Sequence, residues 1–397
     1  MTDSGSTVDG TEVDEWFEQE DDAPEESAEV VTDPALKYAQ SQLRVVREAK
    51  DYQLDYLQHA LRPGRELIDI SPTYQRRLRW PRKKKSLLIE SLLLNIPVPP
   101  IFLFEKDYNE YEVIDGRQRL DAISSFLSND YALSGLEYWP ELNRCRFLDL
   151  PPVIQKGLLR RSLPAVVLLA ESQNSGSDDL DVRRVLFDRL NTGGIRLNPQ
   201  ELRNALYPGT INAMLIRLAR SDSFTDTWGI PPYVQGEEED PSEALLKNAL
   251  FSTLADAELV LRFFALRDAV DHDRKGSLRL ILDHFMKKNA SLSDEKITQL
   301  EQLFTTTLDS LRDIFGPAVF RLKNDGRLSR PLYDALMIAG SRKSFQDSIW
   351  NRNAIKAALS DALADPKSYE ILVGRGNTIG AVHERVELAS RILSAEG

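Results

Sequence analysis

The sequence contains one cysteine, Cys145, and four histidines, His59, His272, His284 and His383. A single cysteine permits neither an intramolecular disulfide nor a zinc site built from thiolates. The histidines form no His-x-Glu or His-Glu-x-x-His pattern, so we expect no metal held by His or Cys, no zinc-supported nuclease centre and no Cys/His nucleophile. A Gly-x-x-x-x-Gly-Lys-Ser/Thr loop is also missing, which excludes a Walker-type NTPase.

Long apolar runs are missing as well. No stretch reaches the roughly 18 consecutive apolar residues that a membrane span requires. The N-terminus is acidic, whereas a secretory signal begins with basic residues followed by an apolar stretch. The composition therefore predicts a protein of a reducing, cytoplasmic compartment that does not enter a membrane.

Lysine and arginine are missing from residues 1–33, which hold 13 acidic residues. The rest of the chain has 49 acidic and 50 basic residues, so the net charge of −12 comes from this segment. Such a polar stretch buries too little apolar surface to offset its ordering entropy, and we predict that 1–33 is a disordered acidic tail. It serves either as a solubilising tail or as a segment that competes with nucleic acid for basic surface.

The length of 397 residues predicts two folded domains. Residues 34–60 carry apolar positions at helical spacing, and strand signals at 68–70, 101–105, 111–114 and 163–170 alternate with helical segments up to about residue 210. Beyond residue 210 only helical periodicity remains, in 243–270, 278–288, 294–315, 331–341, 353–364 and 381–393. The prediction is an α+β protein, with a small mixed sheet in domain 34–210 and an all-helical domain in 211–397.

The segment with the clearest chemical pattern is Tyr111–Leu120. A strand passes through Asp115 and Gly116 to Arg117, Gln118 and Arg119, and a helix is expected directly after them at Leu120–Leu127. The unpaired N–H groups at a helix start favour an anion, and guanidinium groups match phosphate oxygens. Asp115 is suited to hold a metal, orient a ribose hydroxyl or activate water. Taken alone, the pattern is equally compatible with a purely structural turn.

A second segment combines basic and aromatic residues. Seven basic residues lie within positions 76–85, and Tyr74 and Trp80 bracket its arginine-rich end. Cations interleaved with rings suit a nucleotide, because its charge and its base are both contacted. The run Arg82–Lys85 is also compatible with a solvated helix face.

A third segment runs from Val182 to Ala205. It predicts a helix, a sharp turn at Asn191-Thr192-Gly193-Gly194, and a second helix that starts with the capping-box pattern Asn198-Pro199-Gln200-Glu201. The turn is either a structural helix connection or an anion-binding nest that faces the first segment.

Together these segments resemble the N-terminal domain family of GmrSD restriction endonucleases, which has a ParB/sulfiredoxin-like fold. The family pattern contains Tyr-Gln-Arg with a following Trp, a Ser-Leu-rich helix leading to Pro-x-Pro-Pro, Ile-Asp-Gly-Gln-Gln-Arg-Leu, and Phe-x-Arg-Leu-Asn-x-Gly-Gly followed by Gln-Glu-Leu-Arg-Asn-Ala. These stand here as Tyr74-Gln75-Arg76 with Trp80, Ser86–Pro100, Ile114–Leu120 and Phe187–Ala205. The four matches occur in order over about residues 65–210.

The resemblance implies a nucleotide-binding domain that in some relatives hydrolyses NTP and controls cleavage of modified or foreign DNA. Its catalytic residues would be Asp115, Gln118 and Arg119, with Mg²⁺ held through Asp115. Its nucleotide-binding residues would be Tyr74, Gln75, Arg76, Trp80, Gly116, Arg117, Asn191, Gly193 and Gly194. Arg117 stands where the family usually has Gln, so phosphate binding is expected to survive whereas hydrolysis is less strongly implied.

Relatives often carry an HNH nuclease domain after this one, and this sequence has no such pattern. The resemblance therefore predicts a separate HNH-type nuclease as partner, an NTP with Mg²⁺ as cofactor, and DNA bound through Arg82, Lys83, Lys84 and Lys85. Two alternatives remain open: a ParB-like DNA-binding switch that binds nucleotide without hydrolysing it, and an interaction scaffold whose loop is inactive.

Overall fold

The computed structural model describes residues 8–18, 45–62, 67–69, 80–170, 198–237, 241–322, 326–342, 345, 351–374, 376 and 378–394. Contacts divide the chain into two compact units. One comprises Val30–Leu197, which we call the sheet unit, and the other comprises Met1–Glu29 with Asn198–Gly397, which we call the helical unit. Each unit is described by itself.

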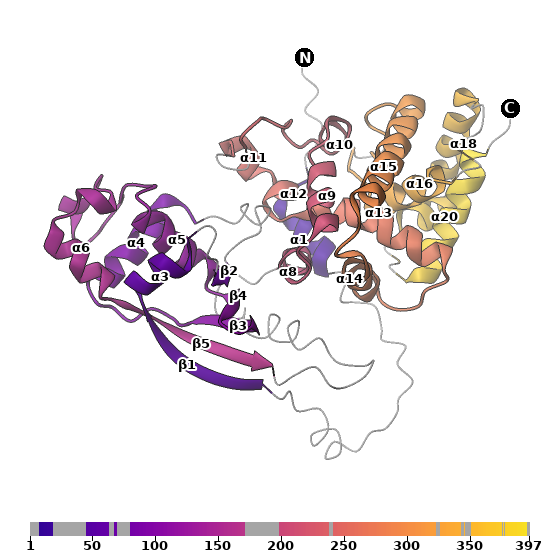
Figure 1. Ribbon diagram of the computed structural model, residues 1–397. Coiled ribbons are helices and arrows are strands. Elements are labelled where there is room, and N and C mark those ends of the chain that lie inside the picture. Colours follow the sequence, from indigo (N-terminus) through magenta and orange to yellow (C-terminus); the bar gives the residue numbers. More distant parts are fainter. Residues whose placement is uncertain are drawn as a thin grey trace. The chain divides into compact units, whose positions relative to one another are not determined.

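The sheet unit contains a five-stranded mixed sheet (Figure 1). Its strand order is β1-β5-β3-β4-β2, in which β1–β5 and β3–β4 are antiparallel and β3–β5 and β2–β4 are parallel. The strands are β1 (Val45–Gln53), β2 (Ile68–Asp69), β3 (Ile101–Asp107), β4 (Glu110–Asp115) and β5 (Ser162–Ala170). The predicted small mixed sheet is confirmed.

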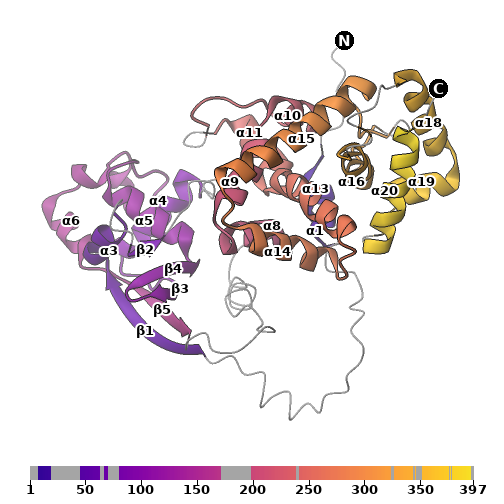
Figure 2. The same cartoon turned by 45° about the vertical axis from the view of Figure 1, so that its right-hand side comes forward.

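Four helices of this unit gather on one side of the sheet (Figures 1 and 2). They are α3 (Leu54–Ala60), α4 (Arg82–Leu93), α5 (Arg117–Leu127) and α6 (Pro152–Leu159), with short 3-10 turns η2 (Pro140–Leu142) and η3 (Phe147–Asp149) before α6. Their apolar faces share one core with the strands, which includes Leu57, Ile89, Leu103, Ile123, Phe126 and Val167. The core thus fixes the start of α5 against the ends of β3 and β4.

The helix expected within 34–60 is only partly correct. Residues 45–53 form strand β1, and helix is confined to α3 among the described residues of this stretch. All nine residues of β1 pair with β5, from Val45 opposite Ala170 to Gln53 opposite Ser162. Backbone pairing with a distant strand therefore overrides the local helical spacing.

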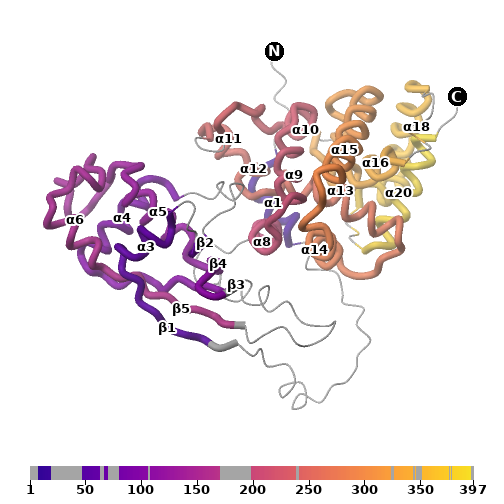
Figure 3. Tube along the Cα trace, viewed as in Figure 1, coloured from indigo at the N-terminus to yellow at the C-terminus, as the bar shows by residue number. Residues whose placement is uncertain are grey.

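The helical unit is built around one buried helix (Figure 3). In α13 (Ala255–Asp271) the residues from Ala255 to Leu266 are all buried, and the helix contacts α8, α9, α12, α14, α16 and α20. The other described helices are α8 (Pro199–Leu206), α9 (Thr210–Leu218), α10 (Asp222–Trp228), α11 (Glu243–Lys247), α12 (Ala249–Ser252), α14 (Leu278–Asn289), α15 (Asp294–Phe315), α16 (Arg330–Gly340), α18 (Arg352–Ala364), α19 (Pro366–Val373) and α20 (Ile379–Leu393). The predicted α+β class with a helical C-terminal part is confirmed.

The single periodic stretch expected at 243–270 is divided into α11, α12 and α13. Asn248 ends α11 and caps α12 by accepting a hydrogen bond from the N–H of Phe251. Leu254 then takes a left-handed conformation with φ of 60° before α13 begins. The apolar spacing alone predicts one continuous helix. The cap at Asn248 and the left-handed conformation of Leu254 divide it into three.

The acidic N-terminal segment is not disordered throughout. Residues 10–18 form helix α1 (Gly10–Glu18), in which Val13, Trp16 and Phe17 are buried in the helical unit. The prediction of disorder is wrong for this stretch, because three apolar side chains find a surface on distant helices. Residues 1–7 and 19–33 lie outside the described part of the chain.

Within the described residues, every helix is too short or too polar to cross a bilayer.

Candidate functional site at the start of α5

The turn between β4 and α5 requires glycine. Gly116 adopts φ of 96°, a left-handed conformation that residues with a Cβ rarely take. A Cβ at this position would lie 2.3 Å from Cγ2 of Ile101, on the neighbouring strand β3. Glycine therefore allows the backbone to pass directly over β3 and to begin α5 at Arg117, three residues earlier than the apolar spacing suggested.

Asp115 and Arg119 form an ion pair across this turn. Nη2 of Arg119 donates to Oδ2 of Asp115 at 2.7 Å and to the carbonyl oxygen of Pro100 at 3.2 Å. Their side chains are 35% and 14% exposed, so the pair lies at the surface with its arginine largely covered. Two residues predicted to be catalytic are thus in direct contact, and each holds the other in place.

The first turn of α5 concentrates positive potential. Gly116 occupies the capping position and has no side chain to accept hydrogen bonds from the first N–H groups of the helix. The half-buried side chains of Arg117 and Arg119 leave the same turn. A helix start without a side-chain cap, the helix dipole and two guanidinium groups together suit an anion with several oxygens.

Gln118 connects the first two sequence segments. Its Oε1 accepts a hydrogen bond from the backbone N–H of Trp80 at 3.0 Å. Trp80 lies just before α4, and its half-buried ring packs against the core of the sheet unit. The structure therefore brings Trp80 to the start of α5, and Gln118 links the first turn of α5 to the residue before α4.

The basic run at the start of α4 is divided between the solvent and the fold. Arg82, Lys83 and Lys84 are exposed, and Nζ of Lys84 lies 4.5 Å above the centre of the Trp80 ring. Lys85 is different, because its Nζ contacts Oδ2 of Asp121 in α5 at 2.6 Å and its side chain is only 13% exposed. Lys85 therefore joins α4 to α5, whereas the other three cations remain accessible.

Sequence reasoning missed a buried carboxylate in α4. Glu90 accepts hydrogen bonds from the backbone N–H groups of Glu137, Tyr138 and Trp139 at 2.9–3.1 Å. Burial raises the pKa of this carboxyl, but the three donors outweigh burial and hold the pKa below its ordinary value. Glu90 thus anchors the segment after α5; its only signal in the sequence is an acidic residue on an otherwise apolar helix face.

The third segment is only partly described. The predicted capping box is present: Oδ1 of Asn198 accepts from the N–H groups of Gln200 and Glu201, and Oε2 of Glu201 accepts from the N–H of Asn198. Nε of Arg203 then contacts Oδ1 of Asp283 at 2.8 Å within the helical unit. The compact units separate before Asn198, so α8 belongs with the helices rather than with the predicted domain 34–210.

Tyr74, Gln75, Arg76, Asn191, Gly193 and Gly194 lie outside the described residues, as does the helix expected at 182–190. Of the predicted nucleotide-binding and catalytic residues, the structure brings together Trp80, Asp115, Gly116, Arg117, Gln118 and Arg119.

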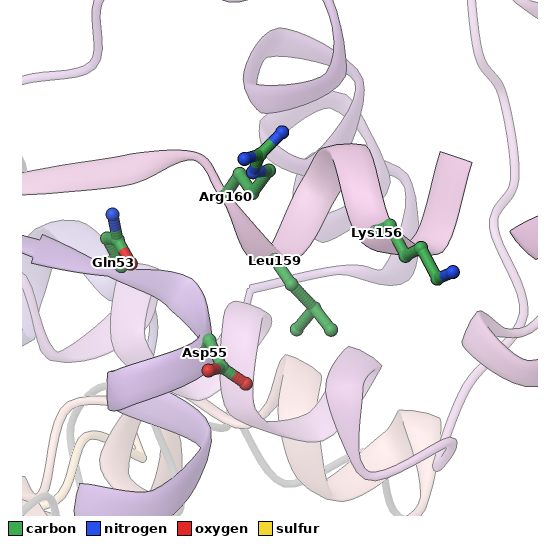
Figure 4. A pocket seen from close by; sticks show the side chains of 5 residues that line it. All are labelled: Gln53, Asp55, Lys156, Leu159 and Arg160. Atoms are coloured by element: carbon green, nitrogen blue, oxygen red, sulfur yellow. The ribbon is translucent and has the colours of Figure 1, made fainter. Parts of the chain in front are cut away.

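A separate pocket lies where β1, α3 and α6 meet (Figure 4). It has a volume of about 320 Å³ and is lined by Gln53, Asp55, Lys156, Leu159 and Arg160. Four of these five side chains are exposed, and in Figure 4 Lys156 and Arg160 point away from one another. The pocket contains none of the predicted site residues, and its polar groups do not converge on one position.

Among the described residues, no group of three or more His, Cys, Asp or Glu side chains has the geometry to hold a metal ion. A single carboxylate, Asp115, stands at the start of α5. One carboxylate alone does not form a metal site, but Mg²⁺ that arrives with nucleotide phosphates needs only one or two protein carboxylates.

Comparison with curated proteins and with solved structures gave no match. A protein-family model does match, over a stretch that contains both the turn at Gly116 and the capping box of α8. Residues 57–208 match the family described as GmrSD restriction endonuclease, N-terminal domain, which confirms the resemblance that the sequence motifs indicated.

Proposed function

We propose that the start of α5 binds the phosphates of a nucleoside triphosphate and promotes hydrolysis of the γ-phosphate, and that this chain is the nucleotide-dependent subunit of a DNA-restriction or phage-defence system. The observation that carries the proposal is the junction itself. A glycine turn that no other residue fits presents an uncapped helix start, with Asp115 and Arg119 in contact beside it. The family match to a restriction endonuclease domain supports the cellular setting.

The Asp115–Arg119 pair suggests how binding would proceed. Arg119 contacts only one oxygen of Asp115 with one nitrogen, so the pair lacks the two parallel bonds of the strongest arginine–carboxylate contacts. A triphosphate at the start of α5 offers Arg119 more charge than one carboxylate does. Arg119 would then turn part of its guanidinium toward the phosphate, and the second oxygen of Asp115 would be available to orient water.

Mg²⁺ bound together with the nucleotide would neutralise part of the negative charge of the phosphates. Asp115 is the carboxylate that would hold it, because it ends β4 at the mouth of the turn. The hydrogen bond from Gln118 holds the backbone of Trp80 near the start of α5. The Trp80 ring would pack against the base or ribose of the nucleotide.

A second candidate function is supported by Arg117 and by the ion pair. Arg117 adds a charge where the family usually has an amide, and Asp115 is engaged by Arg119. Both features favour binding over hydrolysis. They support a nucleotide-operated switch that binds DNA, for which the exposed Arg82, Lys83 and Lys84 would provide phosphate contacts. In either case DNA cleavage would come from a partner nuclease.

Turnover assays with ATP, GTP, CTP and UTP, each with Mg²⁺ and with or without DNA, distinguish these functions. The proposal predicts steady hydrolysis of at least one nucleotide by the wild type and none by Asp115→Ala, whose unfolding midpoint stays near that of the wild type. Arg160→Ala, which removes an exposed cation of the separate pocket, should leave turnover unchanged. Tight binding without turnover would favour the switch, and unfolding of Asp115→Ala would show that the turn is structural.

Arg119 is tested separately by binding. Arg119→Ala should weaken nucleotide affinity by about 1–3 kcal/mol, the range for a hydrogen bond to a charged group. Unchanged affinity would remove this residue from the site.

A further inference from the structure

Strand β1 forms one edge of the sheet in the sheet unit (Figures 1 and 2). Its inner edge pairs with β5 along all nine residues, without a register shift. Among the described residues, no strand pairs with its outer edge. The strand contains no proline or glycine, and nine residues in this conformation span about 30 Å. A long, regular edge of this kind is a template for pairing with another strand.

The backbone of β1 alternates between its two edges. The N–H of Leu54 donates to the carbonyl oxygen of Arg161 at 2.8 Å, and these two residues continue the register between β1 and β5. Hydrogen-bonded pairs recur at every second residue of an antiparallel ladder, so Arg47, Ala49 and Asp51 direct their N–H and C=O groups to the outer edge. A strand that pairs with this edge must therefore form its backbone hydrogen bonds with these residues.

The charges of β1 are arranged symmetrically about Ala49. Glu48 and Lys50 flank it with opposite charge, and Arg47 and Asp51 follow with opposite charge again. An antiparallel copy of the strand centred on Ala49 places Arg47 opposite the copy's Asp51. The same copy places Glu48 opposite the copy's Lys50. Opposite charges that face each other across two strands stabilise their pairing.

The side chains that carry these charges are accessible. Arg47, Glu48, Ala49 and Asp51 are exposed, and Lys50 is half-buried. Nζ of Lys50 contacts Oε2 of Glu48 at 2.9 Å, so these two charges already lie together on one face of the strand. In the antiparallel pair each of these ammonium groups would gain a second carboxylate, from the copy. The charges would then alternate in sign around the centre.

Other symmetric registers are unfavourable. Pairing centred on any of the four charged residues beside Ala49 would place that residue opposite its own copy, and like charges directly opposite one another are destabilising. Pairing centred between two residues would set an outward-facing backbone group opposite an inward-facing one, which prevents the hydrogen bonds. The pairing centred on Ala49 satisfies both the backbone and the charges.

We propose that the outer edge of β1 pairs with β1 of a second copy of this chain, antiparallel and centred on Ala49. Backbone hydrogen bonds provide the attraction, and the alternating charges select the partner and the register. The occupant is a second copy because the charge order of β1 is complementary to its own reverse. The two sheets then join into one continuous sheet through a symmetric interface. This inference does not depend on nucleotide binding.

Charge exchange in the full-length chain tests the pairing. The wild type should form dimers whose fraction in sedimentation velocity rises with concentration. Arg47→Asp and Asp51→Arg each place like charges opposite one another, so each should weaken self-association by about tenfold or more. An equimolar mixture of the two variants should form dimers again, because the acidic positions of one chain then meet the basic positions of the other. This recovery also shows that both variants are folded.

Lys296→Asp is the matched control. It makes the same change of charge at an exposed position of α15 and should associate as the wild type does. A chain that stays monomeric at all concentrations would overturn the proposal. So would wild-type association by both Arg47→Asp and Asp51→Arg, or a mixture of the two that stays monomeric.

Disulfide formation tests the register. In the proposed pairing Ala49 lies opposite its own copy with Cα atoms about 5.5 Å apart, a separation that a disulfide spans. Ala49→Cys should therefore give a covalent dimer in oxidised glutathione. Gln53→Cys is the control, because this exposed residue of the same strand would lie roughly 26 Å from its copy. The wild type, whose single cysteine is Cys145, gives the background. Equal crosslinking of the two variants would overturn the register.

Discussion

Arginine–carboxylate pairs in this protein differ widely in burial, and one pair from each unit shows the contrast. In the helical unit, Arg262 contacts Asp334 with exposed fractions of 1% and 0%. In the sheet unit, Arg119 contacts Asp115 with exposed fractions of 14% and 35%. A fully buried pair cannot separate without leaving a charge in an apolar interior, whereas a pair at the surface exchanges its partners at small cost. The buried pair therefore suits a structural role, and the exposed pair suits a binding site in which Arg119 changes partner when a ligand binds.

The largest expected effect is at the buried pair. Asp334→Ala removes the carboxylate that contacts Arg262 inside the helical unit and should lower the free energy of unfolding by about 3–5 kcal/mol. Denaturant unfolding followed by tryptophan fluorescence measures it. The matched control is Asp226→Ala, which breaks the contact of 63%-exposed Asp226 with Arg312 and should cost less than about 1 kcal/mol. Equal losses would contradict the contrast between buried and exposed pairs.

The next effect concerns the turn that carries the exposed pair. Gly116→Ala meets both a positive φ and a Cβ contact of 2.3 Å with Ile101, so it should destabilise the sheet unit by about 1–3 kcal/mol or more. Gly157→Ala is the matched control, because nothing lies within 4 Å of its Cβ in α6. That change should stabilise the protein by about 0.4–1 kcal/mol. A neutral Gly116→Ala would show that the turn tolerates a side chain.

A smaller effect is expected at Glu201, a carboxylate that accepts a hydrogen bond from the backbone N–H of Asn198. Burial raises the pKa of Glu201 to about 7, and the N–H of Asn198 only partly offsets it. A raised carboxyl pKa means that the folded state holds the proton more tightly, so this contribution to stability is complete below about pH 4.5 and is lost as the pH rises to about 7.

Glu201→Gln keeps an acceptor for the Asn198 N–H but cannot ionise. The variant should be more stable than the wild type at pH 8 by about 1–2 kcal/mol and should show no such advantage at pH 4. Unfolding free energies of both proteins across this range give the comparison. A constant difference at every pH would assign the effect to something other than ionisation.

The smallest effect on stability is expected at the exposed pair. Asp115→Asn should change the unfolding free energy by less than about 1 kcal/mol. The same variant frees Arg119, so in the absence of Mg²⁺ it should bind nucleotide more tightly than the wild type does. Calorimetric titration in the presence of a chelator measures this, with Asp149→Asn, a carboxylate of η3, as the control. Weaker binding by Asp115→Asn under these conditions would show that Arg119 does not exchange between the two anions.

Local signals in the sequence predicted local structure well. The bounds of α15 and the capping box at Asn198 follow from apolar spacing and cap residues, which act within one or two turns. The glycine turn at Gly116 was also predicted, because a strand, a glycine and a helix start adjoin in the sequence. What failed depends on distant partners: β1 is defined by β5, and α1 is defined by Trp228 and Arg330.

The candidate site shows the same division. Asp115, Gly116 and Arg119 lie within five residues, so the sequence predicted that they share a turn. The hydrogen bond between Gln118 and Trp80 joins positions 38 residues apart, and the contact of Lys85 with Asp121 joins two helices. No pattern along the chain indicates that Lys85 forms an ion pair with another helix while Arg82, Lys83 and Lys84 are exposed to solvent.

Isothermal titration of the full-length protein with ATP, GTP, CTP and UTP in the presence of Mg²⁺ tests the central claim most directly. Binding at the start of α5 predicts a saturable signal with one site per chain for at least one of the four, together with a raised melting temperature, and both responses should diminish in Arg119→Ala. The absence of heat and of any melting shift with all four nucleotides would contradict the claim that this turn holds a triphosphate.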